Sequence, residues 1–104
     1  MITTITMFRL PKPLTRDEAR KIFQSTAPKY LGVPGLVRKV YVLYPEGDAV
    51  GGIYLWKSRA DAEAMYDESW RVFVREKYGT EPSVTYLDSP IVVDNVTNEI
   101  ISDG

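Results

Sequence analysis

The 104-residue chain contains no cysteine and no histidine. The absence of cysteine excludes disulfide bonds, thiolate nucleophiles, zinc–thiolate sites and cysteine-ligated iron–sulfur clusters. The absence of histidine excludes an imidazole base for a nucleophilic serine, a proximal histidine for haem, and imidazole ligands for zinc or non-haem iron. Any chemistry must therefore rely on tyrosine, tryptophan, carboxylates, lysine, arginine or backbone groups, or be supplied by the substrate itself.

The sequence also lacks an excess of either charge and any long apolar run. Thirteen basic and fourteen acidic side chains give a formal net charge of −1, and no basic stripe points to a nucleic-acid partner. No apolar run approaches the ~20 residues that span a bilayer, and residues 1–10 lack the cationic start of a signal peptide. We therefore expect a soluble cytoplasmic protein that binds neither nucleic acid nor membranes.

The residue patterns predict alternating strands and helices. Strands are expected where branched and aromatic residues concentrate, and helices where apolar residues recur at helical spacing. A capping box formed by Thr15 and Glu18 opens the first helix, which Pro28 should end or kink, and Gly79 is a typical helix stop. The expected strands cover residues 2–10, 36–44, 51–57 and 83–93, and further helical segments, in two pieces, cover residues 58–78.

This order predicts an α+β fold, a ferredoxin-like βαββαβ domain over residues 1–95 with one extra short helix. Its four strands are expected to form one antiparallel sheet with the helices on one face. A polar C-terminal tail is expected over residues 96–104. The length supports a single domain rather than two.

The strands are apolar on both faces, whereas a sheet with one wet face alternates between apolar and polar residues. In the second strand, Leu36, Val40 and Val42 are expected on one face, and Tyr41 and Leu43 on the other. The helices can cover only one of these faces. We therefore expect a homodimer in which two sheets pack face to face as a dimeric α/β barrel. The alternative is a monomer whose scattered apolar residues remain at the surface.

Aromatic residues make up 12% of the chain, and several are expected between the sheet and the helices. Tyr54 and Trp56 share one face of the third strand, and Tyr66, Trp70 and Phe73 lie on the helices that should cover that face. Such side chains suit a cleft for a flat aromatic ligand, because they combine an apolar body with hydrogen-bonding groups. The alternative is that they fill the core.

Three other features each allow two interpretations. Gly51 and Gly52 mark either a close backbone approach, which could leave room beside a ligand, or an ordinary entry into the third strand. Arg38 and Lys39 are the charged residues of the second strand. One of them is expected either to contact an anionic oxygen of a substrate or to extend its charged end to the solvent-exposed rim of the protein. Four acidic helix residues suggest a divalent cation or, more simply, a solvated surface. These four are Asp61, Glu63, Asp67 and Glu68.

Three segments of the chain resemble the small monooxygenases of the YdhR type. They are residues 34–40 (PGLVRKV), residues 51–56 (GGIYLW) and residues 78–95 (YGTEPSVTYLDSPIVVDN). The resemblance covers roughly residues 1–95. It implies a dimeric α+β barrel and kinship with the antibiotic-biosynthesis monooxygenases.

The resemblance also implies a reaction and a place for it. Proteins of that group oxidise phenolic or anthrone-like substrates with O₂, without flavin, haem or metal, and hold the substrate between the sheet and the helices. A tryptophan at the end of the third strand and an asparagine four residues earlier are associated with this chemistry. Trp56 stands at the tryptophan position, whereas Gly52 stands at the asparagine position. Relatives that bind haem use a histidine, which this chain lacks.

The leading hypothesis is therefore a monooxygenase that needs no cofactor or metal ion and acts with O₂ on a small aromatic, hydroxylated compound. Trp56 and Tyr54 are the expected catalytic residues, as pocket wall and hydrogen-bond donor. The other expected pocket residues are Arg38, Lys39, Gly52, Tyr66, Trp70 and Phe73. A rival hypothesis is a dimeric protein that binds an apolar aromatic metabolite without converting it. A third is a dimer whose cleft is filled by its own aromatic side chains.

Overall fold

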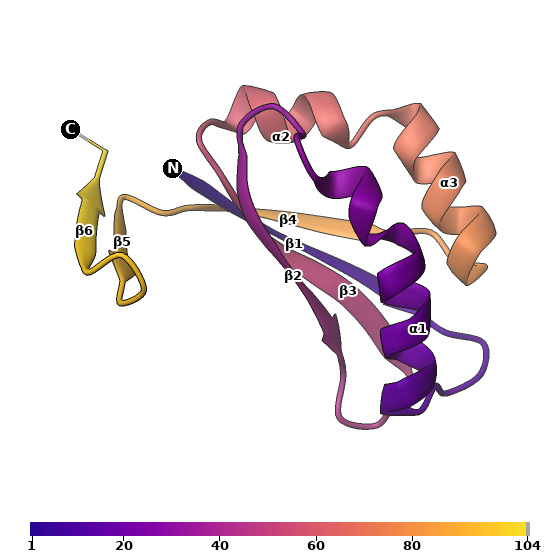
Figure 1. Cartoon of the computed structure of the whole chain (residues 1–104). Helices are drawn as coiled ribbons and strands as arrows, with labels where there is room; N and C mark the ends of the chain where they lie inside the picture. The colour runs from indigo at the N-terminus through magenta and orange to yellow at the C-terminus, as the bar shows by residue number, and fades with distance from the viewer. Residues whose placement is uncertain (104) are drawn as a thin grey trace.

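The computed structural model describes residues 1–103 as a four-stranded sheet, helices on one of its faces and a separate hairpin (Figure 1). The strands of the sheet are β1 (Ile2–Arg9), β2 (Leu36–Leu43), β3 (Ala49–Trp56) and β4 (Ser83–Asp88). The helices are α1 (Arg16–Thr26), the 3₁₀ helix η1 (Ala27–Tyr30), α2 (Arg59–Met65) and α3 (Glu68–Tyr78). The hairpin consists of β5 (Ile91–Asp94) and β6 (Glu99–Ser102).

The strand order in the sheet is β2-β3-β1-β4, and all neighbouring strands are antiparallel. This order confirms the expected ferredoxin-like α+β fold. The helix signals are confirmed as well: Thr15 and Glu18 form the capping box of α1, and Gly79 ends α3 in the left-handed conformation. Asp67, between the two expected helical pieces, caps α3. Within residues 1–103, no helix is both long and apolar enough to cross a membrane.

A bulge in β2 changes one expected placement. The pairing of β2 with β3 skips Val37, which lies between the paired residues Leu36 and Arg38. An extra residue of this kind shifts the alternation of side chains between the two faces. Leu36 therefore stands opposite the buried Trp56 and packs against the core on the helix-covered face. The expectation that Leu36 shares a face with Val40 is wrong for this reason.

The single strand expected over residues 83–93 is divided in two. Ser89 and Pro90 separate β4 from β5, which leaves the sheet and pairs with β6. Proline favours such a break because it has no amide hydrogen to donate to a neighbouring strand. The range expected to be a tail, 96–104, contains the hairpin turn and β6, and residue 104 lies outside the described residues.

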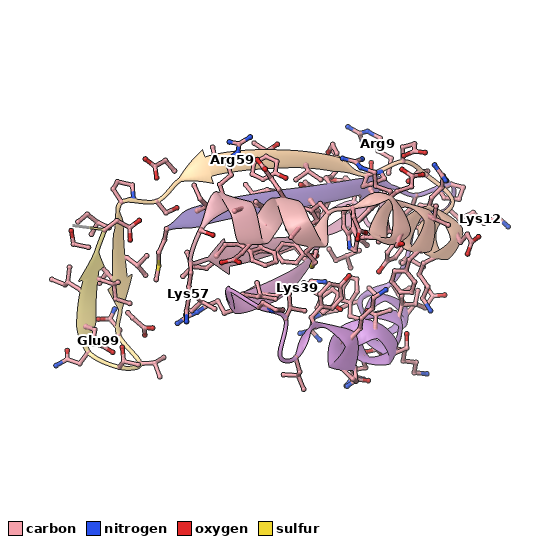
Figure 2. All side chains as sticks on the ribbon, turned by 90° about the horizontal axis from the view of Figure 1, so that it is seen from above. Arg9, Lys12, Lys39, Lys57, Arg59 and Glu99 are labelled. Carbon is pink, nitrogen blue, oxygen red and sulfur yellow. The ribbon has the colours of Figure 1, made fainter. Side chains whose placement is uncertain are left out.

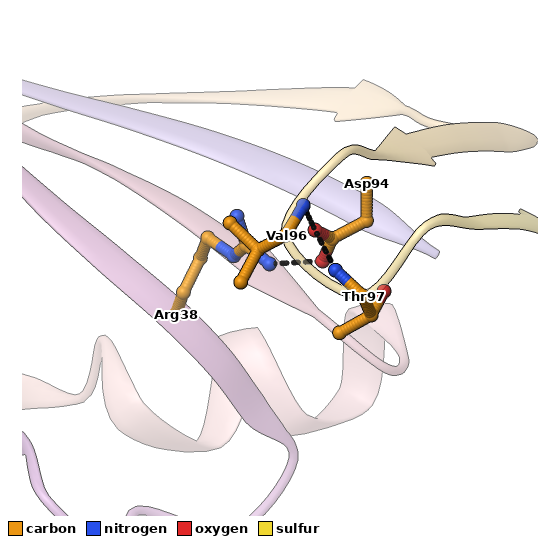
Figure 3. A network of polar contacts seen from close by, with 4 residues as sticks. All are labelled: Arg38, Asp94, Val96 and Thr97. Carbon is orange, nitrogen blue, oxygen red and sulfur yellow. Dashed lines mark hydrogen bonds and ion pairs between the residues drawn. The ribbon is translucent and has the colours of Figure 1, made fainter.

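One carboxylate, that of Asp94, joins the hairpin to β2 (Figure 3). Arg38 Nη2 donates to Asp94 Oδ2 at 2.5 Å, and the amides of Val96 and Thr97 donate to Asp94 Oδ1 at 2.9 and 3.3 Å. The Thr97 amide, then the Arg38 guanidinium and then the Val96 amide lower the pKa of the Asp94 carboxyl. The same charged group thus closes the hairpin turn and fixes the hairpin beside the sheet.

Candidate functional site

Four aromatic side chains pack against one another in a layer between β3 and the helices α2 and α3. These residues, Tyr54, Trp56, Tyr66 and Trp70, are called the aromatic layer below. Tyr54 is 1% exposed and Trp56 0%. Their rings stack with centroids 5.9 Å apart, while the Tyr66 ring lies 5.5 Å from Tyr54, edge-on, and 4.7 Å from Trp70. The structure thus brings four of the expected pocket residues together and packs them against one another.

Two threonines of β1 provide hydrogen-bond partners for this region. Thr4 Oγ1 accepts a hydrogen bond from Trp56 Nε1 at 2.9 Å and lies 2.5 Å from the Tyr66 hydroxyl oxygen. Thr6 Oγ1 accepts a hydrogen bond from the Gly52 amide at 3.0 Å. Both threonines are fully buried. The sequence analysis missed them, although threonine at alternate positions of an apolar strand is the available signal, because alternate residues share one face.

Burial keeps the phenols of the aromatic layer protonated. Desolvation is the largest influence on the hydroxyls of Tyr54 and Tyr66, and it raises the pKa of both. A neutral phenol donates and accepts hydrogen bonds but does not take up a proton near neutral pH. The proton acceptor of any reaction in this layer must therefore be another group.

The Thr4→Val substitution should lower the free energy of unfolding by about 2 kcal/mol. Valine keeps the shape of the side chain, but it leaves Trp56 Nε1 and the Tyr66 hydroxyl without their buried partner. Urea unfolding followed by tryptophan fluorescence would measure the loss. Lys12→Met, at an exposed position outside the sheet, is the control and should change stability by less than about 0.5 kcal/mol. Equal losses in the two variants would contradict this role of Thr4.

Lys39 of β2 lies inside a cage of three tyrosines. Its Nζ atom is 3.3 Å from the ring centroid of Tyr30, 3.8 Å from that of Tyr41 and 4.8 Å from that of Tyr54. Desolvation, and to a lesser degree the positive charge of Lys29, lowers the pKa of the Lys39 amine to about 7. The tyrosine faces stabilise the charged ammonium form, whereas the loss of contact with water destabilises it. The neutral and the charged amine therefore coexist near neutral pH.

Gly52 makes room for this lysine on the neighbouring strand. A Cβ atom at position 52 would lie 3.1 Å from Lys39 Cε and 2.9 Å from Tyr54 Cε1. Glycine is therefore the residue that lets the lysine side chain cross β3 towards the aromatic layer. Gly52 was expected in the pocket, and the structure places it beneath Lys39 and Tyr54. The structure favours the close-approach interpretation of the glycine pair.

Two of the grooves in the described residues, and one small void, meet at Tyr30 of the cage. The interior void, about 10 Å³ in volume, lies among Thr6, Tyr30, Lys39, Tyr54 and other core residues. One groove, of about 380 Å³, lies between η1 and the helices α2 and α3 and reaches Trp70; it is called the helical groove. The other, of about 560 Å³, lies between η1 and β2 and reaches Lys39; it is called the strand groove. Tyr30 lines all three spaces.

Tyr30 closes the interior from both grooves. Its hydroxyl accepts a hydrogen bond from Trp70 Nε1 at 3.2 Å, and its ring lies 6.1 Å from the ring of Tyr54. On the strand side, the Tyr41 hydroxyl lies 2.7 Å from Thr26 Oγ1. Tyr41 was expected on one face of the second strand, and neither Tyr30 nor Tyr41 was expected in the site. Only the three-dimensional packing brings them to the lysine.

The remaining expected residues lie at or beyond the edge of this site. Arg38 stands opposite Leu55 and forms its ion pair with Asp94, so the structure does not bring its guanidinium to the aromatic layer. Phe73 of α3 is half-buried and lines the interior void, and Lys29 Nζ lies 3.5 Å from its ring centroid.

Three of the four acidic residues considered as a cation site, Asp61, Glu63 and Asp67, have local partners. Ser58 Oγ donates to the Asp61 carboxylate at 2.9 Å, Asp67 Oδ1 accepts from the Trp70 amide at 2.9 Å, and Glu63 accepts from Arg59 at 2.7 Å. These are helix-capping and surface contacts. In the part of the chain that the structure describes, no group of three or more aspartate or glutamate residues is placed to hold a metal ion.

No known family profile and no curated protein sequence matches this chain. Solved structures do match. A monooxygenase from the gene ActVA-Orf6 of Streptomyces coelicolor, in complex with the ligand nanaomycin D, superposes with a TM-score of 0.64 at 16% identity, over 85% of this chain and 86% of that one. An antibiotic biosynthesis monooxygenase gives a TM-score of 0.63 at 16% identity, over 86% and 98% of the two chains.

A third similar structure is SnoaB of Streptomyces nogalater, a cofactor-independent oxygenase. It gives a TM-score of 0.61 at 14% identity and covers 85% of this chain and 91% of its own. The TM-scores establish a similar fold, and the low identities do not establish the same reaction. The chain therefore has the ferredoxin-like α+β fold of the antibiotic-biosynthesis monooxygenases.

Proposed function

We propose that this protein is an oxygenase that acts with O₂ on a small aromatic, hydroxylated compound. The observation that carries the proposal is the aromatic layer with its hydroxyl partners, approached by two open grooves that meet at Tyr30. Grooves of a few hundred cubic ångströms with aromatic walls are typical of sites for small organic ligands. The fold likeness to three oxygenases, one of them cofactor-independent, supports the same reaction class.

The proposed reaction oxidises a methylene group next to an aromatic ring to a carbonyl group. One atom of O₂ becomes the carbonyl oxygen, and the other leaves as water with the two methylene hydrogens. The ionised substrate supplies the electrons, so the protein contributes orientation, a dry site and hydrogen-bond donors. Trp56 and Tyr54 are the proposed catalytic residues of this reaction, and Tyr66 and Trp70 its wall on the helix side. Because the interior void holds only about 10 Å³, the substrate reaches them only when Tyr30 moves.

A second candidate function is binding without conversion. The small size of the interior void and the glycine at position 52 favour it, because a tightly packed aromatic layer needs no substrate to fill it. In this case the grooves would hold an aromatic metabolite against Tyr30 and Trp70.

Oxygen uptake separates the two candidates. Purified protein is incubated with a panel of anthrones, and O₂ consumption is followed with an electrode. Binding is followed in parallel by a fluorescence titration. The oxygenase proposal expects protein-dependent uptake. Uptake should be at least tenfold weaker in Trp56→Phe, which lacks the indole N–H, and unchanged in the control Lys12→Met, at an exposed position outside the sheet. Binding across the panel without any uptake would establish the second candidate instead.

The proposal includes a homodimer formed by the sheet face that the helices leave uncovered. On this face Val40, Ile53 and Leu87 are 52%, 41% and 46% exposed, which is unusual for neighbouring apolar residues on a sheet. The β5–β6 hairpin extends the apolar surface with Ile91 and Val93. Two such faces in contact would produce the expected dimeric α/β barrel. The YdhR-type kinship and the cytoplasmic location expected from the sequence also belong to this proposal.

Placing a charge at the centre of this face should abolish the dimer. Ile53→Glu buries a carboxylate at a face-to-face contact, so we expect the monomer mass in light scattering for the variant and the dimer mass for the wild-type protein. Leu31→Glu, on the other side of the molecule at an exposed residue, is the matched control and should leave the dimer intact. A wild-type protein that is monomeric at high micromolar concentration would contradict the dimer.

A further inference from the structure

The amine of Lys39 lies beside the aromatic layer without a polar partner from the described residues. Within residues 1–103 its contacts are the faces of Tyr30, Tyr41 and Tyr54, and it takes part in no ion pair or side-chain hydrogen bond. The other core polar groups, such as Thr4 Oγ1 and Trp70 Nε1, have partners. An amine with three unused hydrogen-bonding positions is therefore available to a ligand.

The position of this amine differs from that of the other lysines. Figure 2 shows Lys39 in the middle of the molecule, whereas Lys12 and Lys57 extend from its edges. Lys39 lines both the interior void and the strand groove, so it stands at the boundary between the core and an opening to solvent. A molecule that enters the strand groove meets this amine before it meets Tyr54.

The walls of the strand groove suit an aromatic ring. Pro28, Leu36 and the rings of Tyr30 and Tyr41 line it, and its volume of about 560 Å³ is ample for a fused ring system. The ring would lie against tyrosine faces, as stacked aromatic pairs do. A hydroxyl on its inner edge would then point at Lys39 Nζ.

We propose that Lys39 is the base that accepts the proton of an acidic aromatic hydroxyl when such a compound binds in the strand groove. The O–H bond of the phenol or enol breaks, an N–H bond forms at Nζ, and the products are a phenolate or enolate and an ammonium ion, with no change in total charge. The proposal rests on the proposed function, because the resulting anion is the species from which O₂ takes electrons. Lys39 thereby serves as the proton acceptor, a role that the neutral tyrosines cannot fill.

The electrostatic surroundings support this role. The groups facing the amine are the phenols of Tyr30, Tyr41 and Tyr54, which stay neutral because burial raises the pKa of each, and the positive charge of Lys29 on η1. These conditions favour a neutral amine, ready to accept a proton, in the unliganded protein. Once a phenolate is present, the new ammonium gains an ion-pair partner inside a dry site.

The probe for this proposal is 4-nitrophenol, whose phenol and phenolate forms have distinct absorption spectra. The wild-type protein should bind it and lower the pKa of the bound phenol, favouring the phenolate at least tenfold over the free probe at the same pH. Lys39→Met should lose this preference and bind at least tenfold more weakly near about pH 8. Lys12→Met removes an exposed lysine and is the matched control, with wild-type behaviour expected.

Two further variants test whether the position and the proton-accepting ability of the Lys39 amine cause the phenolate preference. Gly52→Ala pushes against Lys39 Cε and should displace the amine, with a partial loss of the phenolate preference and a normal circular dichroism spectrum. Lys39→Arg keeps a positive charge but cannot accept a proton, so each neutral probe molecule that binds as the phenolate should release its proton to the buffer, measured near about pH 7 by calorimetry in two buffers. Wild-type protein should release fewer protons than this variant at the same pH, because Lys39 retains them.

The probe experiment tests Lys39 separately from the proposed oxygenase activity. Phenolate preference that depends on Lys39, without O₂ uptake on any substrate, would support the base and reject the oxygenase. Oxygen uptake that survives in Lys39→Met, or a bound probe that keeps its ordinary pKa in the wild-type protein, would overturn the assignment of Lys39.

Discussion

Replacing Gly51 with alanine is expected to lower the free energy of unfolding by about 3 kcal/mol. A Cβ atom at this position would lie 1.8 Å from the carbonyl oxygen of Thr6 and 2.8 Å from its carbonyl carbon. Both are backbone atoms of β1, which is paired on its other edge with β4 and cannot retreat. The clash can be relieved only by separating the central strands of the sheet. Guanidinium unfolding followed by circular dichroism would give the loss.

Gly79→Ala is the matched control for this substitution. Gly79 has φ +79°, yet a Cβ atom there would meet nothing within 4 Å. The cost is therefore the left-handed backbone alone, about 1 kcal/mol. If Gly51→Ala were no more destabilising than Gly79→Ala, β1 and β3 would not approach as closely as the structure indicates.

Replacing Lys39 with methionine is expected to stabilise the protein at low pH and to do so less and less as the pH rises. Burial lowers the pKa of this amine from 10.5 to about 7 in the folded chain. Below about pH 7 the amine is charged in both states, so the folded protein bears the whole desolvation cost. Between about pH 7 and 10.5 the folded amine is neutral while the unfolded one is charged, and the cost disappears progressively.

The expected gain in the free energy of unfolding is on the order of 3 kcal/mol near pH 6 and close to zero near pH 10. It would be obtained as the difference between the urea unfolding curves of the two proteins across this range, since the other titrating groups cancel in the difference. Lys12→Met, at an exposed position, should give no pH-dependent difference. A constant difference between wild type and Lys39→Met would show that Lys39 is not desolvated.

The fold was predictable because each strand and helix carries its own signal. The alternation of Tyr54 and Trp56 against Ile53 and Leu55 in β3 agrees with the two faces that the structure shows. The bulge at Val37 was not predictable, because an uninterrupted run of strand-forming residues contains no mark of the skipped position. The hairpin was missed for a related reason: residues 96–104 are polar enough to read as a tail, and the pairing of β5 with β6 depends on a turn closed by Asp94.

The grouping of the aromatic residues was predictable from the sequence, whereas the threonine partners of β1 and the tyrosine cage around Lys39 were not. Tyr54, Trp56, Tyr66 and Trp70 were expected near one another, because strand and helix periodicity place them on facing surfaces. The cage around Lys39 combines tyrosines from η1, β2 and β3, so it depends on how these elements pack. Periodicity within one element cannot show such an arrangement.

The shared wall at Tyr30 couples the helical groove and the strand groove. One side chain borders the helical groove, the strand groove and the interior void. Any rotation of η1 that lets an aromatic ring pass on one side therefore widens or narrows the path on the other. Binding of one compound would consequently change how readily a second small molecule such as O₂ can enter.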